Sequence, residues 1–216
     1  MTSRTDQQGQ AHGQDGTHAH APPAKDEKIH GYYQLLGLAL KELLIEKEIV
    51  TGDEIRRAIE GRDAITPALG AKVVARAWID PSYKERLLRA GSEAVKELGI
   101  EPGALHLSVV ENTPRVHNVI VCTLCSCYPR NVLGLPPSWY KSREYRSRVV
   151  REPRAVLAEF GTELPDDVEV LVHDSTADLR YLVLPMRPEG TENLNEEDLA
   201  ALVSRDCMIG VSVVKA

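Results

Sequence analysis

Apolar side chains in the first half of the chain recur at the spacing of an α-helix, among residues that favour helices. Between residues 31 and 50 the leucines at this spacing are Leu35, Leu36, Leu40, Leu43 and Leu44. Thr51 followed by Glu54 fits a capping box and predicts a second, short helix. The segments ALGAKVVARAWID and PSYKERLLRAGSEAVKELG predict two more helices. We therefore expect residues 29–100 to form a helical arm.

After residue 103 the pattern changes to an alternation rich in β-branched side chains. The segments that predict strands are LHLSVVENT, HNVIVC, VEVLVHDS, LRYLVLP and MIGVSVV. Helical segments from Arg151 to Phe160 and from Glu196 to Arg205 interrupt them. The pattern predicts an α+β fold, in which the helical arm is followed by an α/β-layered domain at 101–216.

Residues 1–28 are rich in Gly, Gln and His and contain almost no aliphatic side chains. This composition cannot offset the entropy of ordering, so we expect a disordered tail. His12, His18 and His20 could bind a metal ion, but incidental histidines in a polar tail are the more common situation. We assign them no site.

Composition and charge narrow the choice of function. A chain of 216 residues with 43% hydrophobic content can bury one sizeable core. Its formal net charge of -6 disfavours binding to a phosphate backbone, so we expect no nucleic-acid partner. It has neither a run of 18 apolar residues nor the apolar centre of a signal peptide, so we expect a cytoplasmic protein without a membrane partner. In that reducing compartment, clustered cysteines indicate metal or redox chemistry.

Three of the four cysteines fall in the stretch VCTLCSCYPR, directly after a predicted strand. Thiolates spaced C-x-x-C-x-C can converge on one soft metal ion, such as Zn, Cu(I) or iron. A structural zinc site would need a fourth protein ligand, which is missing locally. Cys207 lies beside Met208 and Ile209, and we interpret it as a small core residue. The nearest candidates for further ligands are the backbone nitrogens of the loop itself.

A longer series of motifs resembles the α subunit of nitrile hydratase, of the cobalt type. The motifs are VCTLCSCYP, VLGLPPSWYKS, YRSRVVREPRAVLAEFG, DSTADLRYLVLPMRPEGT and RDCMIGV. The resemblance extends from about Leu35 to the C-terminus and is densest from Val121 onward; this ordered series is far more specific than C-x-x-C-x-C alone. It implies that 101–216 is a four-layer α-β-β-α catalytic domain carrying a cysteine claw, the name we give to residues 122–127. The implied reaction is hydration of nitriles to amides.

The resemblance also implies a metal centre at the claw. The metal would be octahedral, non-corrin Co(III), one per chain, with Fe(III) as the alternative; Thr123 stands where cobalt-type members carry Thr. The implied ligands are the thiolates of Cys122, Cys125 and Cys127 and the deprotonated amide nitrogens of Ser126 and Cys127. The sixth position is left for water or substrate. Cys125 would be oxidised to a sulfinic acid and Cys127 to a sulfenic acid, while Cys122 would stay a thiolate.

Further residues of the motifs are assigned roles around this centre. The residues that we assign to catalysis are Cys127, Ser126 and Arg130. The residues that match the family's groups supporting the ligands are Thr123, Asp174, Asp178 and Arg180. For Asp178 in particular, a solvated charge is the alternative. The metal could polarise the nitrile or lower the pKa of a water molecule, and whether the sulfenate oxygen of Cys127 is the nucleophile stays open.

Arg130 departs from the nitrile hydratase pattern, which has Trp at this place. The γ subunit of thiocyanate hydrolase, a close relative with the same claw, has Arg there. A cation suits anionic thiocyanate, whereas an indole suits an apolar nitrile. Because GLPPSWY and Asp178 resemble nitrile hydratase more closely, nitrile hydration is our first interpretation. Hydrolysis of thiocyanate to carbonyl sulfide and ammonia is the second.

The resemblance implies that the chain is incomplete alone. A β subunit would supply arginines that donate hydrogen bonds to the oxidised cysteines, and a third subunit and an activator or metallochaperone are further candidate partners. A zinc-stabilised module that binds phosphates is an alternative from another class. Its basic residues would be Lys141, Arg143, Arg146, Arg148, Arg151 and Arg154. Net acidity and the interleaved Glu144 and Glu152 favour a solvated face or a subunit contact instead.

Overall fold

The structure is a computed structural model that describes residues 31–216. The chain divides into two compact units, Met1–Gly52 and Asp53–Ala216, which are described separately. The predicted tail at 1–28, with its three histidines, lies outside the described residues. Within the described part of the chain, no helix combines the length and the apolar character needed to cross a membrane.

The described part of the first unit contains helix α1 (Tyr32–Glu46), which confirms the helix expected from the leucine spacing. The helix begins after Gly31, whose backbone N–H donates to the Gln34 side chain at 3.0 Å. None of its residues is buried. Its large exposed apolar side chains are Tyr32, Tyr33, Leu35, Leu36, Leu38, Leu40, Leu43 and Ile45. The apolar pattern therefore forms a helix whose apolar side chains are left exposed among the described residues.

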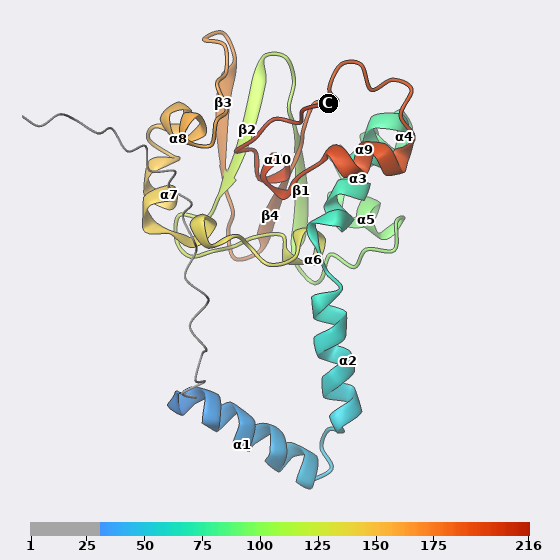
Figure 1. Cartoon of the computed structure of the whole chain (residues 1–216), viewed down its shortest axis with the longest axis vertical. Helices are drawn as coiled ribbons and strands as arrows, with labels where there is room; N and C mark the ends of the chain where they lie inside the picture. The colour runs from blue at the N-terminus through green and yellow to red at the C-terminus, as the bar shows by residue number, and fades with distance from the viewer. Residues whose placement is uncertain (1–30) are drawn as a thin grey trace, which may run out of the picture. The chain divides into compact units, whose positions relative to one another are not determined.

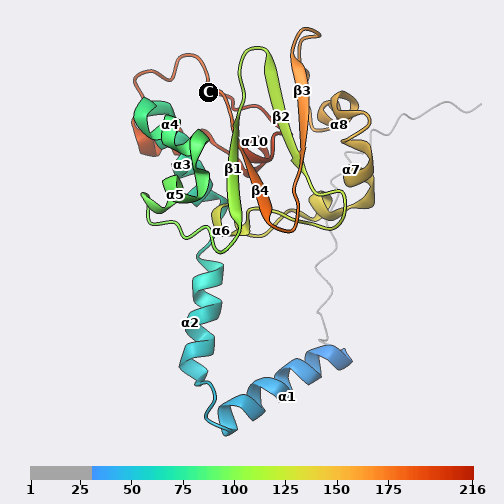
Figure 2. The same cartoon turned by 180° about the vertical axis from the view of Figure 1, so that it is seen from behind.

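The second unit contains most of the secondary structure (Figure 1). Its helices are α2 (Gly52–Asp63), α3 (Pro67–Ile79), α4 (Pro81–Arg89), α5 (Gly91–Lys96), α6 (Arg130–Leu133), the 3-10 helix η1 (Ser138–Lys141), α7 (Arg143–Arg148), α8 (Pro153–Glu159), α9 (Glu196–Leu202) and α10 (Arg205–Ile209). Its strands are β1 (His106–Glu111), β2 (Val116–Val121), β3 (Glu169–Asp174) and β4 (Leu179–Leu184). The strands lie between α3, α4, α5 and α9 on one side and α7 and α8 on the other (Figures 1 and 2). The α+β class is confirmed.

The strands form two parallel pairs, β1 with β4 and β2 with β3. In the second pair, Val121, the last residue of β2, lies opposite Asp174, the last residue of β3. Parallel strands place their carboxyl ends at the same edge and need a long crossover between them. The loop after β2 therefore begins beside the loop after β3.

One hydrophobic core joins the strands to the helices that precede them. Val73 and Val74 of α3 and Ile120 of β2 are completely buried in it. Gly91 begins α5 so close to β1 that a Cβ atom there would lie 2.5 Å from the carbonyl oxygen of Leu107. The proposed division of the chain at residue 100 stays a prediction, since α3, α4 and α5 pack in this shared core.

The strand expected at MIGVSVV is wrong. Residues 205–209 form α10, whose N-cap Ser204 accepts a hydrogen bond from the backbone N–H of Cys207 at 3.3 Å. Gly210 ends the helix in the left-handed region, with φ of 91°. A Cβ atom at Gly210 would lie 2.0 Å from the carbonyl oxygen of Asn118, so only glycine fits. These capping residues outweigh the β-branched alternation.

Candidate metal centre

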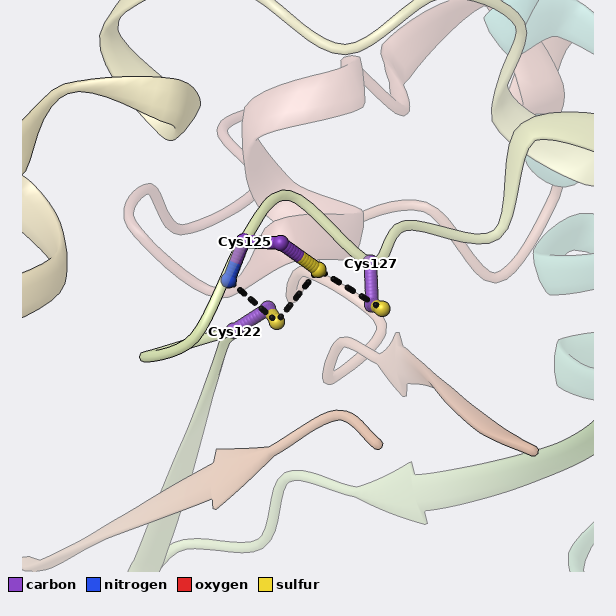
Figure 3. A group of neighbouring side chains, drawn as sticks. All are labelled: Cys122, Cys125 and Cys127. Atoms are coloured by element: carbon purple, nitrogen blue, oxygen red, sulfur yellow. Dashed lines mark hydrogen bonds between the residues drawn. The ribbon is translucent and has the colours of Figure 1, made fainter. Parts of the chain in front are cut away.

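The cysteine claw directly follows β2 and brings three sulfur atoms together (Figure 3). The Sγ atoms of Cys122 and Cys125 are 3.5 Å apart, and those of Cys125 and Cys127 are 3.3 Å apart. The backbone N–H of Cys125 also donates to Cys122 Sγ at 3.3 Å. Cys122 is buried, Cys127 is half-buried and Cys125 is exposed. The claw thus has its first sulfur in the core and its second at the surface.

The sulfur spacing fits coordination of one ion. All three sulfur atoms lie within 4.8 Å of one another, and they form the one such group of potential ligands within residues 31–216. Two sulfurs at about 2.3 Å from an ion are about 3.3 Å apart at a right angle and about 3.8 Å apart at a tetrahedral angle. The observed 3.3 Å matches the right-angled value, and the observed 3.5 Å lies between the two values. The three thiol sulfurs therefore suit one soft metal ion, and their spacing fits either geometry.

The thiols of the claw differ in acidity. Hydrogen bonding with Cys127 and then with Cys122 lowers the pKa of Cys125 to about 7. Burial, followed by the effects of Cys125 and Cys122, raises the pKa of Cys127 to about 12, although Arg180 acts in the opposite direction. Within this coupled pair, Cys125 is the group that loses its proton first.

The start of the claw is held by side chains that contact Thr123. Its backbone N–H and its hydroxyl both donate to the Asp174 carboxylate, at 2.9 and 2.5 Å. Its carbonyl accepts a hydrogen bond from the Arg146 guanidinium at 3.4 Å. Asp174 ends β3, so the parallel pairing described above places this carboxylate beside the claw.

The end of the claw rests on a buried tyrosine. The hydroxyl of Tyr140, in η1, donates to the carbonyl oxygen of Cys127 at 2.9 Å. Tyr140 is completely buried and packs edge-on against the ring of Tyr128. Sequence reasoning missed this contact and that of Arg146. The motif VLGLPPSWYKS contains Tyr140 and was the signal in the sequence that could have indicated the Tyr140 contact.

A cavity of about 380 Å³ opens against the claw. The cavity is lined by the loop at 102–105 and by residues from the claw onward, namely Cys125, Ser126, Cys127, Tyr128, Pro129, Arg130 and Asn131, together with Arg180. Arg130 is exposed and, within the described residues, its guanidinium has no hydrogen bond or ion pair. Arg180 differs, because its guanidinium donates to the carbonyls of Ala177 and Leu179 at 3.3 and 3.1 Å. The cavity thus contains one cation free to meet a bound molecule and one held by the backbone.

The structure therefore brings together most of the residues selected from the sequence. Asp178 is different: its exposed carboxylate has no hydrogen bond or ion pair among the described residues, and it does not line the cavity. Cys207 is buried in α10, where its sulfur lies 3.1 Å from the Ser204 hydroxyl. It is not part of the sulfur group of the claw.

Comparisons with known proteins agree with this geometry. Residues 32–212 match the family model described as nitrile hydratase, alpha chain. The chain is 53% identical over 196 residues to the cobalt-containing nitrile hydratase subunit alpha of Pseudonocardia thermophila, covering 88% of this chain and 95% of that one. It is 43% identical over 195 residues to the thiocyanate hydrolase subunit gamma of Thiobacillus thioparus, covering 85% and 80%. A solved recombinant thiocyanate hydrolase with partially modified cobalt centres superposes with a TM-score of 0.78 at 42% identity, covering 86% and 91%. From the extent of these matches, the chain belongs to the nitrile hydratase alpha chain family.

Proposed function

We propose that this chain is the α subunit of a nitrile hydratase and that its claw holds a non-corrin Co(III) ion. The proposed ligands are the thiolates of Cys122, Cys125 and Cys127 and the amide nitrogens of Ser126 and Cys127. The proposed reaction adds water across the C≡N bond of a small nitrile and gives an amide. When bound, such an ion supplies a Lewis acid that polarises the nitrile or activates water.

The observation that carries this proposal is the convergence of the three claw sulfur atoms beside an open cavity. A closed tetrahedral zinc site would need a fourth side chain, and the described residues provide no further cysteine, histidine or carboxylate in the group. The cobalt-containing relative favours cobalt over iron. The cytoplasm stays our expected compartment, because clustered cysteines in a reducing compartment fit a metal site better than disulfides.

The residues around the claw would act by orienting its donors and by receiving the substrate. Asp174 holds Thr123 through two hydrogen bonds, so the first turn of the claw is fixed before anything binds. Arg180 places positive charge near Cys127, where it would favour an anionic sulfenate. Oxidation of Cys125 to a sulfinate and of Cys127 to a sulfenate belongs to the proposal. The exposed position of Cys125 and the half-buried position of Cys127 leave both sulfurs within reach of an oxidant.

Thiocyanate hydrolysis is a second candidate because of Arg130. Its guanidinium lines the cavity without a partner among the described residues, so it is available to a small anion. The same family of folds includes the thiocyanate hydrolase subunit gamma named above, at lower identity than the nitrile hydratase relative. Nitrile hydration is therefore our first choice of activity, and thiocyanate is the substrate to compare against it.

We further propose that a β subunit completes the enzyme and supplies arginines to the oxidised cysteines. Two exposed regions of this chain support a partner surface. The apolar side chains of α1 are uncovered, and Leu124, at the tip of the claw, is 89% exposed.

The proposal is tested by producing the chain together with its neighbouring reading frames in medium containing cobalt. We expect about one cobalt per chain, two added oxygens on Cys125 and one on Cys127 in peptide mass spectra, and conversion of small nitriles to amides. Stoichiometric zinc in place of cobalt, or unmodified thiols in a fully active sample, would contradict it. Activity on thiocyanate with no activity on any nitrile would select the second candidate.

A further inference from the structure

Tyr140 has no role in the function proposed above, yet within the described residues it makes the one hydrogen bond from a side chain outside the claw to Cys127, at the end of the claw. Its hydroxyl donates to the Cys127 carbonyl at 2.9 Å. By contrast, three hydrogen bonds hold the start of the claw at Thr123. The exposed part of the claw between these two points has no comparable support, so its end depends on a single hydroxyl.

Ser175 lies beside Tyr140 and has an unused hydroxyl. It follows β3 directly, and its backbone N–H donates to the Val121 carbonyl at 2.7 Å, which places it next to Cys122. Its Oγ atom is buried and has no hydrogen-bond partner in the described part of the chain. Burial raises the pKa of Tyr140 and the nearby Cys122 raises it further, whereas the neighbouring Ser175 hydroxyl lowers it. Ser175 is therefore a neighbour of Tyr140 whose buried hydroxyl is not committed to another acceptor among the described residues.

The two hydroxyl groups could form a relay of donors, because each has one proton to give. The Ser175 hydroxyl can donate to the Tyr140 oxygen, and the Tyr140 hydroxyl donates to the Cys127 carbonyl. Each hydrogen bond in such a chain polarises the next, and a buried network is most effective when all of its members are satisfied. The relay uses both buried hydroxyl groups and ends on a claw residue.

We propose that Tyr140, supported by Ser175, is a positioning residue for the claw. By holding the Cys127 carbonyl it restrains the backbone at Cys127, from which both the Cys127 sulfur and its amide nitrogen extend. The consequence for a metal rests on the proposed function, because both of those atoms are ligands there. Tyr140 touches neither substrate nor reacting atoms and acts only through Cys127.

The chain offers a matched control for the test. Tyr145 is also buried, and its hydroxyl also donates to a backbone carbonyl, that of Ile120 at 2.8 Å, but this acceptor lies in β2 rather than in the claw. Tyr140→Phe and Tyr145→Phe therefore remove the same group from similar surroundings. Ser175→Ala removes the second donor of the relay without altering a ring, and it provides a second variant if Tyr140→Phe fails to fold.

The first measurement needs no metal. In the metal-free full-length chain, iodoacetamide should alkylate Cys127 several-fold faster in Tyr140→Phe than in the wild type, and to a smaller degree in Ser175→Ala. Tyr145→Phe should match the wild type. Equal Cys127 rates in Tyr140→Phe and Tyr145→Phe would overturn the inference, whether or not the chain binds cobalt.

The second measurement uses the chain produced in cobalt medium. Tyr140→Phe should release cobalt to a chelator about 10–100-fold faster and shift the sulfur-to-cobalt absorption band, because residues that orient ligands have effects of this size. Tyr145→Phe should change neither quantity, and an equal change in both variants would show a merely structural role. A wild-type chain without cobalt would contradict the proposed function alone, since the alkylation result would still decide the role of Tyr140.

Discussion

The cysteine claw and helix α1 are both exposed in part, but their contacts differ. Thr123 and Cys127 of the claw bind side chains from β3, η1 and α7, so its conformation is determined within the chain. Helix α1 has a regular apolar pattern and no buried residue. The claw is therefore a site prepared by its own fold, whereas no residue of α1 is buried by the rest of the described residues. Substitutions in the two regions should have different consequences.

The largest effect should come from the claw. Cys122→Ser, Cys125→Ser or Cys127→Ser should each reduce cobalt content almost to zero, because each removes a soft ligand from a site with none to spare. Metal analysis of the purified variants measures this. Cys207→Ser is the control and should keep its cobalt, since Cys207 lies in α10 away from the claw. The reverse result would show that the metal site is elsewhere.

The next effect concerns α1. Leu36→Glu combined with Leu40→Glu should weaken binding to the proposed β subunit about 10–100-fold, which is typical of losing central apolar contacts. The thermal unfolding of the chain alone should change little, since neither leucine is buried. Lys41→Gln, a polar exposed position of the same helix, is the control. Calorimetric titration with the partner measures the affinity, and an unchanged value would show that α1 needs no partner.

The third prediction tests whether Arg130 acts in the cavity beside the claw or at a partner surface. If it serves the cavity, Arg130→Trp should lower kcat/KM for thiocyanate about tenfold or more and raise the turnover of apolar nitriles, because a charged hydrogen bond is lost and an apolar surface gained. If it serves a partner surface, as α1 does, both activities and the assembly should fall together. Arg115→Trp, an exposed residue between β1 and β2, controls for adding an indole. Side-by-side assays of both substrates separate these outcomes.

The smallest effect should appear in the pH dependence of stability. Burial lowers the pKa of His117, although its hydrogen bond to the Gly210 carbonyl opposes this. The folded chain thus prefers neutral His117, so its contribution to stability is present above the ordinary histidine pKa of about 6.5 and is lost as pH falls through the lowered value. His117→Gln should flatten the decline in unfolding free energy on the acidic side, by about 1.4 kcal/mol per unit of lowering.

Exposed His106 is the matched control for removing a histidine, and His106→Gln should follow the wild-type curve. Chemical unfolding between pH 5 and pH 8 measures all three proteins. A wild-type stability that is unchanged over this range would contradict the assignment. His117 lies at the start of β2, away from the claw that follows its end, so its substitution should leave the cobalt content intact.

The elements with strong periodicity could be predicted from the sequence, and short ones could not. Helix α1 and the four strands follow apolar spacing directly. Helices α6 and α7 and the 3-10 helix η1 have four to six residues each, too few to show a helical period. MIGVSVV was assigned to a strand because β-branched residues hid the capping by Ser204 and Gly210. The alternation of β-branched residues carries no information about the residues that cap the two ends of α10.

The spacing of the cysteines was enough to predict the claw, but only some of the residues that hold its backbone could be predicted from the sequence. Asp174 was selected through a family motif, and the register of β2 and β3 explains physically why it reaches Thr123. Tyr140 and Arg146 contact backbone carbonyls of the claw, and such contacts leave no pattern in the sequence because any residue offers a carbonyl. The predicted role of Asp178 stays a prediction, and its carboxylate is exposed.

The hydrogen bonds between Thr123 and Asp174 join residues 51 positions apart. Contacts of such sequence separation form slowly, after local helices. The claw is contiguous in sequence, yet we expect it to reach its final shape only after the crossover through α6, α7 and α8 has brought β3 alongside β2. During synthesis, the cysteines leave the ribosome before Asp174 does, and at that stage they are ordinary flexible thiols open to zinc or oxidation. Selective loading of the metal would therefore be a late event in the life of the chain, controlled by the completion of folding.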